Sequence, residues 1–253
     1  MKITSLKVTP IRSRGLLLQI HTDEGLTGCG SPMNYEHGRT VERAILDMSE
    51  YLVGRDPRQL EDHWQALFRS SYSRQMPILL SALSGLDMAC LDILGKSLDA
   101  PVWRLLGGSC RDRFRVYGSA GGKSPEDYAE SARKTVEAGF TALKIPPFPE
   151  PVRYIDSPAC IDRVVARIAA VRDAVGPEVD MALDFHRAVS PPMAKLILRE
   201  IEPLRPMFVE EPTHPENVDA LLEITRSTPI PIATGERNTT RWGFREIVEK
   251  KAA

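Results

Sequence analysis

Three acidic residues, each following a strand-like apolar run, are the first candidates for chemistry in this 253-residue chain. Asp184 lies in LDFH, Glu210 in VEEP and Glu236 in TGER, and successive members are 26 positions apart. Because a regular βα repeat places equivalent residues at one height on neighbouring strands, we expect the three carboxylates to meet at the C-terminal rim of a β/α barrel. Three such charges would repel one another unless a cation lay among them.

Carboxylate oxygens with open coordination positions suit Mg²⁺, which keeps water molecules or takes oxygens from a substrate. The spacing therefore predicts Asp184, Glu210 and Glu236 as ligands of Mg²⁺. The alternative is that each acid caps the helix that follows its strand, as acidic residues in βα loops often do.

Two basic residues near these acids are candidates for proton transfer. His186 lies two positions after Asp184, and strand alternation would turn both side chains to the same side. Imidazole titrates near neutral pH, so we predict His186 as a general acid. Lys144 ends an earlier strand-like run and is the second catalytic candidate. The alternative for Lys144 is a rim lysine in a solvated loop.

Two charged residues follow the predicted ligands directly. Adjacent strand residues face opposite ways, so Glu211 should pair inside the rim while Glu210 faces the metal. Arg237 is a candidate partner for Glu211 or for a substrate carboxylate, with a structural ion pair as the alternative.

The surrounding sequence supplies two kinds of scaffold for these residues. Residues 1–112 show strand-like runs at 3–8 and 16–20, then helical spacing at 39–53, 58–70 and 78–98, which indicates an α+β domain. Residues 113–253 alternate short apolar runs with amphipathic helices. We count strands near 116–118, 140–145, 179–185, 207–209 and 230–233. This alternation predicts an incomplete TIM-type β/α barrel of about five βα units.

Composition excludes several other classes of protein. The net charge of −1 gives no basic field for nucleic acid. We find no apolar run near the roughly 18 residues that a membrane helix needs, and no signal-peptide core at the start. The cysteines are scattered without a CxxC pair and indicate reduced thiols in the cytoplasm; they are Cys29, Cys90, Cys110 and Cys160.

Several of these motifs resemble the mandelate racemase and muconate lactonizing branch of the enolase superfamily. The likeness lies in Ala82–Ala89 with Asp92, Gly95-Lys96, Pro101 and Leu105–Gly108, and in the acidic trio on three successive strands. The stretches Asp184–His186, Pro192–Lys195 and Ala233–Arg237 look most like the galactonate dehydratases.

The resemblance implies a carbon–oxygen lyase of carbohydrate acid catabolism. A proton next to the carboxylate of an aldonate such as galactonate would be removed, with Mg²⁺ stabilising the enediolate. Loss of the 3-hydroxyl, with His186 as acid, would give a 2-keto-3-deoxy acid. The α+β domain would cap the rim and contact substrate through Arg14, Asn34, Tyr35 and His37.

Two alternatives stay open beside the dehydratase. One is a racemase, epimerase or cycloisomerase of the same family, although Lys144-Ile145-Pro146 lacks the second lysine of the racemase Lys-x-Lys motif. The other is a non-catalytic remnant that only binds metal or a partner. A full barrel has eight βα units, so we expect a truncated chain with impaired turnover, and the base for the α-proton beyond residue 253. The resemblance also implies a homo-oligomer in the full-length form.

Overall fold

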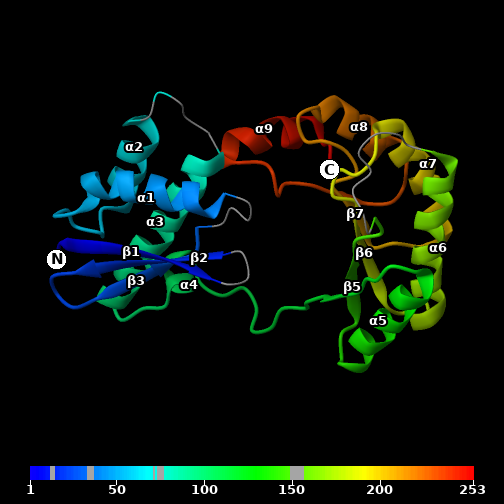
Figure 1. The fold of residues 1–253 in the computed structure, drawn as a ribbon, viewed down its shortest axis with the longest axis horizontal. Coiled ribbons are helices and arrows are strands. Elements are labelled where there is room, and N and C mark those ends of the chain that lie inside the picture. Colours follow the sequence, from blue (N-terminus) through cyan, green and yellow to red (C-terminus); the bar gives the residue numbers. More distant parts are fainter. Residues whose placement is uncertain (12–14, 33–36, 71, 73–76, 149–156) are drawn as a thin grey trace. The chain divides into compact units, whose positions relative to one another are not determined.

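The computed structural model describes residues 1–11, 15–32, 37–70, 72, 77–148 and 157–253. The chain forms two compact units, Met1–Arg113 and Phe114–Ala253, whose elements are labelled in Figure 1. Their boundary lies one residue from the one that the sequence predicts. Each unit has its own hydrophobic core and is described by itself.

The first unit consists of an antiparallel sheet and helices. Its strands pair in the order β1-β2-β3 and are β1 (Ile3–Ile11), β2 (Gly15–Thr22) and β3 (Thr27–Gly30). Its helices are α1 (Gly38–Leu52), α2 (Leu60–Ser70), α3 (Pro77–Ser97) and α4 (Val102–Leu105). Alternation along β2 buries Leu16, Leu18 and Ile20 in one core with the inner faces of α1 and α3.

Close contact between β3 and α3 requires glycine on the strand. A Cβ at Gly28 would overlap the carbonyl oxygen of Ala89, and a Cβ at Gly30 would overlap that of Gly85. Since any side chain at these positions would push the strand from the helix, the TGCG sequence of β3 fixes how closely they pack.

Helix α3 corrects one expectation from composition. It contains an 18-residue window of mean hydropathy 1.7, so by length and composition it is apolar enough to cross a membrane. The expectation that no run approaches this length was wrong. The apolar residues have a role inside the unit, because Ala82, Leu86, Ala89 and Ile93 are buried in the core against the sheet and α1. A core helix meets the same criterion.

The second unit is a five-stranded parallel sheet with the strands in chain order. The strands are β4 (Gly118–Ser119), β5 (Ala142–Ile145), β6 (Asp180–Asp184), β7 (Phe208–Glu210) and β8 (Ile232–Ala233). The sheet does not close, so β4 and β8 form its edges and each is two residues long within the described chain. This arrangement confirms the predicted open arc of five βα units.

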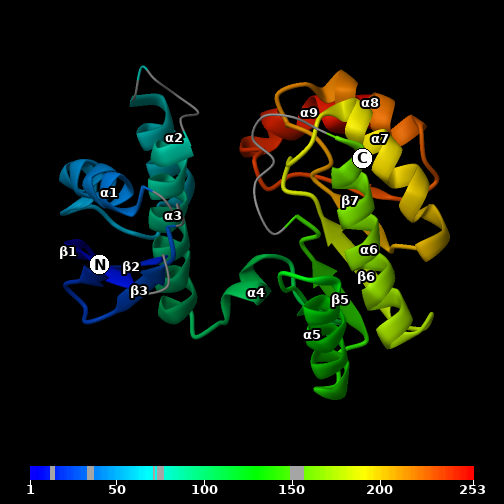
Figure 2. The same ribbon diagram turned by 45° about the vertical axis from the view of Figure 1, so that its right-hand side comes forward.

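Helices connect the strands and pack against one another in the same order, as Figure 2 shows. They are α5 (Pro125–Glu137), α6 (Pro158–Val175), α7 (Pro191–Ile201), α8 (Val218–Arg226) and α9 (Thr240–Lys250), with a short 3₁₀ turn at Glu202–Leu204. Ser124 begins α5 in a capping box with Asp127, and the Ser190 side chain accepts the amide hydrogen of Met193 at the start of α7.

The first barrel strand lies slightly later than predicted. The sequence suggests Val116–Gly118, whereas pairing with β5 begins at Gly118, opposite Leu143. Val116 and Tyr117 are exposed and take no part in the sheet. The core beneath the sheet joins Leu143, Leu183 and Val209 to the helices, which fixes the strand ends that carry the candidate site.

Candidate active site

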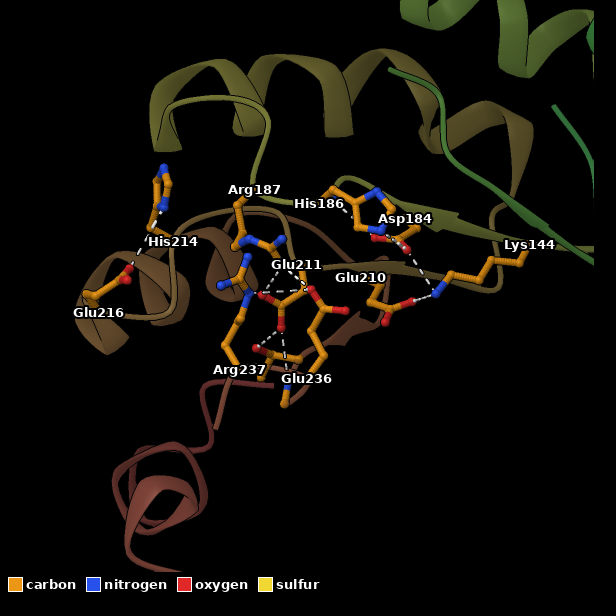
Figure 3. A network of polar contacts seen from close by, with 12 residues as sticks. Lys144, Asp184, His186, Arg187, Glu210, Glu211, His214, Glu216, Glu236 and Arg237 are labelled. Atoms are coloured by element: carbon orange, nitrogen blue, oxygen red, sulfur yellow. Dashed lines mark hydrogen bonds and ion pairs between the residues drawn. The ribbon is translucent and has the colours of Figure 1, made fainter. Parts of the chain in front are cut away.

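Two carboxylates at the ends of neighbouring strands converge on one cation. Asp184 ends β6 and pairs in register with Glu210 at the end of β7. The ammonium of Lys144 on β5 lies 2.9 Å from Asp184 Oδ2 and 2.8 Å from Glu210 Oε2. Figure 3 shows these side chains pointing toward one another. Asp184 is only 2% exposed, so its charge depends on neighbouring cations rather than on water.

The two carboxylates keep Lys144 protonated. Burial alone would lower the pKa of its ammonium, but hydrogen bonds to Asp184 and Glu210 outweigh burial and raise the pKa above its ordinary value. In this arrangement Lys144 acts as a cation, and it cannot accept a proton as a base would.

His186 reaches the same carboxylate from a tight turn. Its amide donates to Asp184 Oδ1 at 3.1 Å, and its ring Nε2 lies 2.9 Å from Asp184 Oδ2. The ring is half exposed, so it remains open to a ligand at the rim. From the sequence, strand alternation predicts that Asp184 and His186 face the same side. In the structure β6 ends at Asp184, so the turn after the strand produces the contact.

That turn has an unusual backbone. Ala188 donates its amide hydrogen to the carbonyl of Phe185, and the two residues between them, His186 and Arg187, have φ values of 48° and 59°. Two consecutive left-handed residues define a type I′ turn, in which Asn-Gly and similar pairs are preferred. Side chains with a Cβ cost about 1 kcal/mol or more at each such position.

A second group of charges lies on the loops after β7 and β8. Glu211 is 1% exposed, and its Oε1 accepts the Thr234 hydroxyl at 2.8 Å and the Gly235 amide at 3.0 Å. The guanidinium of Arg187 lies 3.4 Å from Glu211 Oε2 and also pairs with Glu236 (Figure 3). Glu211 therefore pairs inside the rim as expected, with Arg187 as its partner.

The third predicted ligand is not at the height of the other two. Glu210 pairs in register with Ala233, so Glu236 lies three positions further along, in the turn after β8. Equal intervals in sequence do not give equal heights here, because β8 stops at Ala233 and residues 234–237 leave the sheet. Within the described ranges, no three His, Cys, Asp or Glu side chains form a preformed metal cluster.

The chemistry of the first pair nevertheless fits a divalent cation. Asp184 and Glu210 offer two hard oxygens to one position, and the Lys144 ammonium already occupies that position as a cation. Glu236 is 39% exposed on its side chain, and its pair with Arg187 involves Oε1, so Oε2 can face a ligand. The ion pair with Arg187 offsets the effect of burial, which alone would raise the pKa of Glu236, and the net shift is downward.

The predicted substrate contacts divide into described and undescribed residues. Arg237 is 59% exposed, and its Nε lies 4.0 Å from Glu236 Oε1. The ion-pair partner of Glu211 is Arg187 instead. His37 is exposed and directly precedes α1 in the first unit. Arg14, Asn34 and Tyr35 lie outside the described residues.

The sequence argument missed Arg187. The available signal was a basic residue beside His186 in a rim loop that follows a predicted ligand. With several carboxylates expected nearby, any basic residue in that loop is a candidate partner.

Comparison with known proteins covers both units. Residues 6–107 match the family model for the mandelate racemase/muconate lactonizing enzyme N-terminal domain, and residues 127–253 match the model for the enolase C-terminal domain-like family. The chain belongs to the mandelate racemase/muconate lactonizing enzyme family. The resemblance inferred from the sequence motifs is therefore confirmed.

Curated members of this family are similar along nearly the whole chain. A D-galactonate dehydratase from Variovorax paradoxus is 44% identical over 99% of the chain, and one from Ralstonia nicotianae is 43% identical over 98%. The chain spans 65% of the length of each of these relatives.

Solved structures of the family share the fold. A mandelate racemase/muconate lactonizing enzyme-like protein from Rubrobacter xylanophilus has a TM-score of 0.91 at 34% identity, covering 100% of this chain and 71% of its own. An enolase from Pantoea ananatis with bound D-gluconate and Mg has a TM-score of 0.88 at 27% identity, covering 99% of this chain and 69% of its own.

Proposed function

We propose that this chain carries the cation-binding part of a Mg²⁺-dependent sugar-acid dehydratase acting on an aldonate such as galactonate. The observation that carries the proposal is the convergence of Asp184 and Glu210 on one cation, with His186 on the same carboxylate. The similarity to two D-galactonate dehydratases supports the reaction class and the first substrate to test.

Asp184, Glu210 and Glu236 would hold the ion, with Lys144 moving from its position between the first two. Bound Mg²⁺ would supply Lewis acidity at the substrate carboxylate and so make the neighbouring α-proton easier to remove. The displaced ammonium of Lys144 remains a cation and would contact that carboxylate. The family resemblance assigns removal of the α-proton to an Asp–His pair on later strands.

His186 would protonate the departing 3-hydroxyl oxygen as a general acid. Asp184 orients the imidazole, since one carboxylate oxygen accepts the His186 amide hydrogen and the other lies against ring Nε2. The half-exposed ring lies at the rim, where a substrate hydroxyl could reach it. A lysine-based racemase is less well supported, because Pro146 stands where the second lysine of the racemase motif is expected.

Calorimetric titration of the chain with MgCl₂ tests the cation site. We expect saturable binding that Glu210→Gln abolishes, because the variant removes one of the two convergent charges. Glu223→Gln is the matched control, since Glu223 is exposed on α8 and pairs only with Lys195 in its described contacts. Absence of binding to the unaltered chain, or equal loss in both variants, would refute the cation site.

A panel of sugar acids, assayed for 2-keto product as semicarbazones, tests the reaction class. Because the family resemblance places the α-proton base on later strands, we expect only slow product formation from galactonate or another aldonate, and a further loss of at least about 100-fold in rate for His186→Asn if the ring is the general acid. Epimerised substrate without keto product would instead favour a racemase or epimerase. Cation binding without any turnover would favour the non-catalytic alternative. The cytoplasmic location and the homo-oligomer remain predictions.

A further inference from the structure

Arg187 connects three rim loops that lie far apart in the sequence. It belongs to the turn after β6, and its guanidinium contacts Glu211 after β7 and Glu236 after β8. Its amide also donates to the carbonyl of Glu211 at 2.9 Å, so backbone and side chain both fix it to that residue. The side chain is only 14% exposed, which limits competition from water for these contacts.

Glu211 is itself fixed before it meets Arg187. Its amide donates to the carbonyl of Ala233 at 2.9 Å, and its carboxylate accepts hydrogen bonds from Thr234 and Gly235. Glu211 thereby ties its own loop to the segment that leads into Glu236. Arg187 completes a closed set of contacts among the three loops (Figure 3).

The backbone of Arg187 adds a second observation, because its φ of 59° is left-handed. Its left-handed backbone would be easier for glycine. Backbone strain of this kind persists where the surrounding contacts hold the strained residue in place.

We propose that Arg187 is a positioning residue that holds the Glu236 carboxylate at the rim for a divalent cation. It binds Oε1 of Glu236, which leaves Oε2 available to the ion. Partners that hydrogen-bond to a metal-binding carboxylate fix its orientation, and their loss weakens metal affinity by about 10–100-fold. The inference rests on the proposed cation site and adds a residue that the sequence argument did not assign.

Calorimetric Mg²⁺ titration of three variants tests the proposal. Arg187→Met keeps the length of the side chain and removes its charge, so we expect about 10–100-fold weaker binding. Arg187→Lys should recover part of the affinity, because one ammonium can still reach one of the two carboxylates. Arg245→Met is the matched control, since Arg245 is exposed on α9 and pairs with Glu249; it should bind like the unaltered chain.

Chemical rescue separates positioning from general stability. In Arg187→Gly the turn is free of strain and the cation is missing, so a few millimolar guanidinium chloride should restore Mg²⁺ affinity toward that of the unaltered chain. Melting temperatures are recorded alongside. Unchanged or tighter Mg²⁺ binding in Arg187→Met would overturn the proposal, as would a lowered melting temperature with full Mg²⁺ affinity.

A metal-free measurement keeps this inference distinct from the proposed function. Without Mg²⁺, loss of the bridge in Arg187→Met should speed amide hydrogen exchange in residues 234–238, whereas Arg245→Met should not. If the unaltered chain binds no Mg²⁺, the proposed function fails, and the exchange result alone shows whether Arg187 bridges Glu211 and Glu236. Unchanged exchange in Arg187→Met overturns the inference in either case.

Discussion

Removal of the buried carboxylate of Glu211 should destabilise the second unit more than any exposed acid in that unit would. Glu211→Ala takes away the acceptor of the Thr234 hydroxyl and the Gly235 amide, and one of the two anions beside Arg187. Breaking a buried ion pair by removing one partner costs about 3–5 kcal/mol. Because Arg187 keeps Glu236 as a partner, we expect the lower end of that range, about 3 kcal/mol.

A closer substitution divides this cost between charge and hydrogen bonding. Glu211→Gln keeps the shape and one acceptor oxygen, so the hydrogen bonds to Thr234 and Gly235 can survive in neutral form. Hydrogen bonds to charged groups contribute about 1.5–3 kcal/mol and neutral ones about 1 kcal/mol. We therefore expect Glu211→Gln to cost about 1–2 kcal/mol, clearly less than Glu211→Ala.

Urea unfolding followed by tryptophan fluorescence measures these costs. Trp242 on α9 reports on the second unit, so the experiment uses a background in which Trp64 and Trp103 of the first unit are phenylalanine. Glu223→Ala, at an exposed position on α8, is the control and should change stability by less than about 0.5 kcal/mol. A Glu211→Ala cost no larger than that of the control would refute the reasoning about the buried network.

Three further predictions concern the first unit. Hydrogen bonds from Arg58 lower the pKa of Asp56 to about 2 from 3.8, so the ionised carboxylate contributes stability above pH 4 that is lost as the pH falls toward 2. Asp56→Asn should therefore cost about 1 kcal/mol of unfolding free energy at pH 6, after allowance for solvent screening. Urea unfolding at a series of pH values should show the difference in unfolding free energy between the variant and the unaltered chain shrinking by pH 3. Burial raises the pKa of Cys90 to about 12, so iodoacetamide at pH 8 should alkylate exposed Cys110 and spare Cys90. Mass spectrometry of peptides measures the labelling, and alkylation of Cys90 to the same extent as Cys110 would contradict the packing around Cys90. Gly28→Ala should lower stability by about 2 kcal/mol or more, since the new methyl group overlaps the backbone of α3; a melting temperature equal to that of the unaltered chain would contradict this contact.

Local sequence signals were sufficient for most of the second unit. Its strands are short apolar runs and its helices carry N-caps that the sequence displays, such as Ser124 before Pro125. These features depend on neighbours in the chain, so they can be recognised without knowledge of the fold. The pairing of Asp184 with Glu210 also followed from spacing, because β6 and β7 both end at the acidic residue.

The remaining features depend on contacts between distant segments. The place where β8 leaves the sheet puts Glu236 beyond the register position, and the one local sign is Gly235, whose φ of 136° does not by itself say where the strand ends. The left-handed turn at His186 and Arg187 contains no glycine, so the usual sequence sign of such a turn is missing. The role of Arg187 follows only once three loops are seen together.

The two-residue length of the outer strands has a consequence for self-association. A strand on the rim of an open sheet can recruit another polypeptide through its unsatisfied backbone groups, and long flat strands recruit best. Because β4 and β8 are only two residues long, each can form very few backbone hydrogen bonds with a strand of another molecule. Molecules in concentrated solution should therefore not associate edge to edge through β4 or β8, even though the sheet is open.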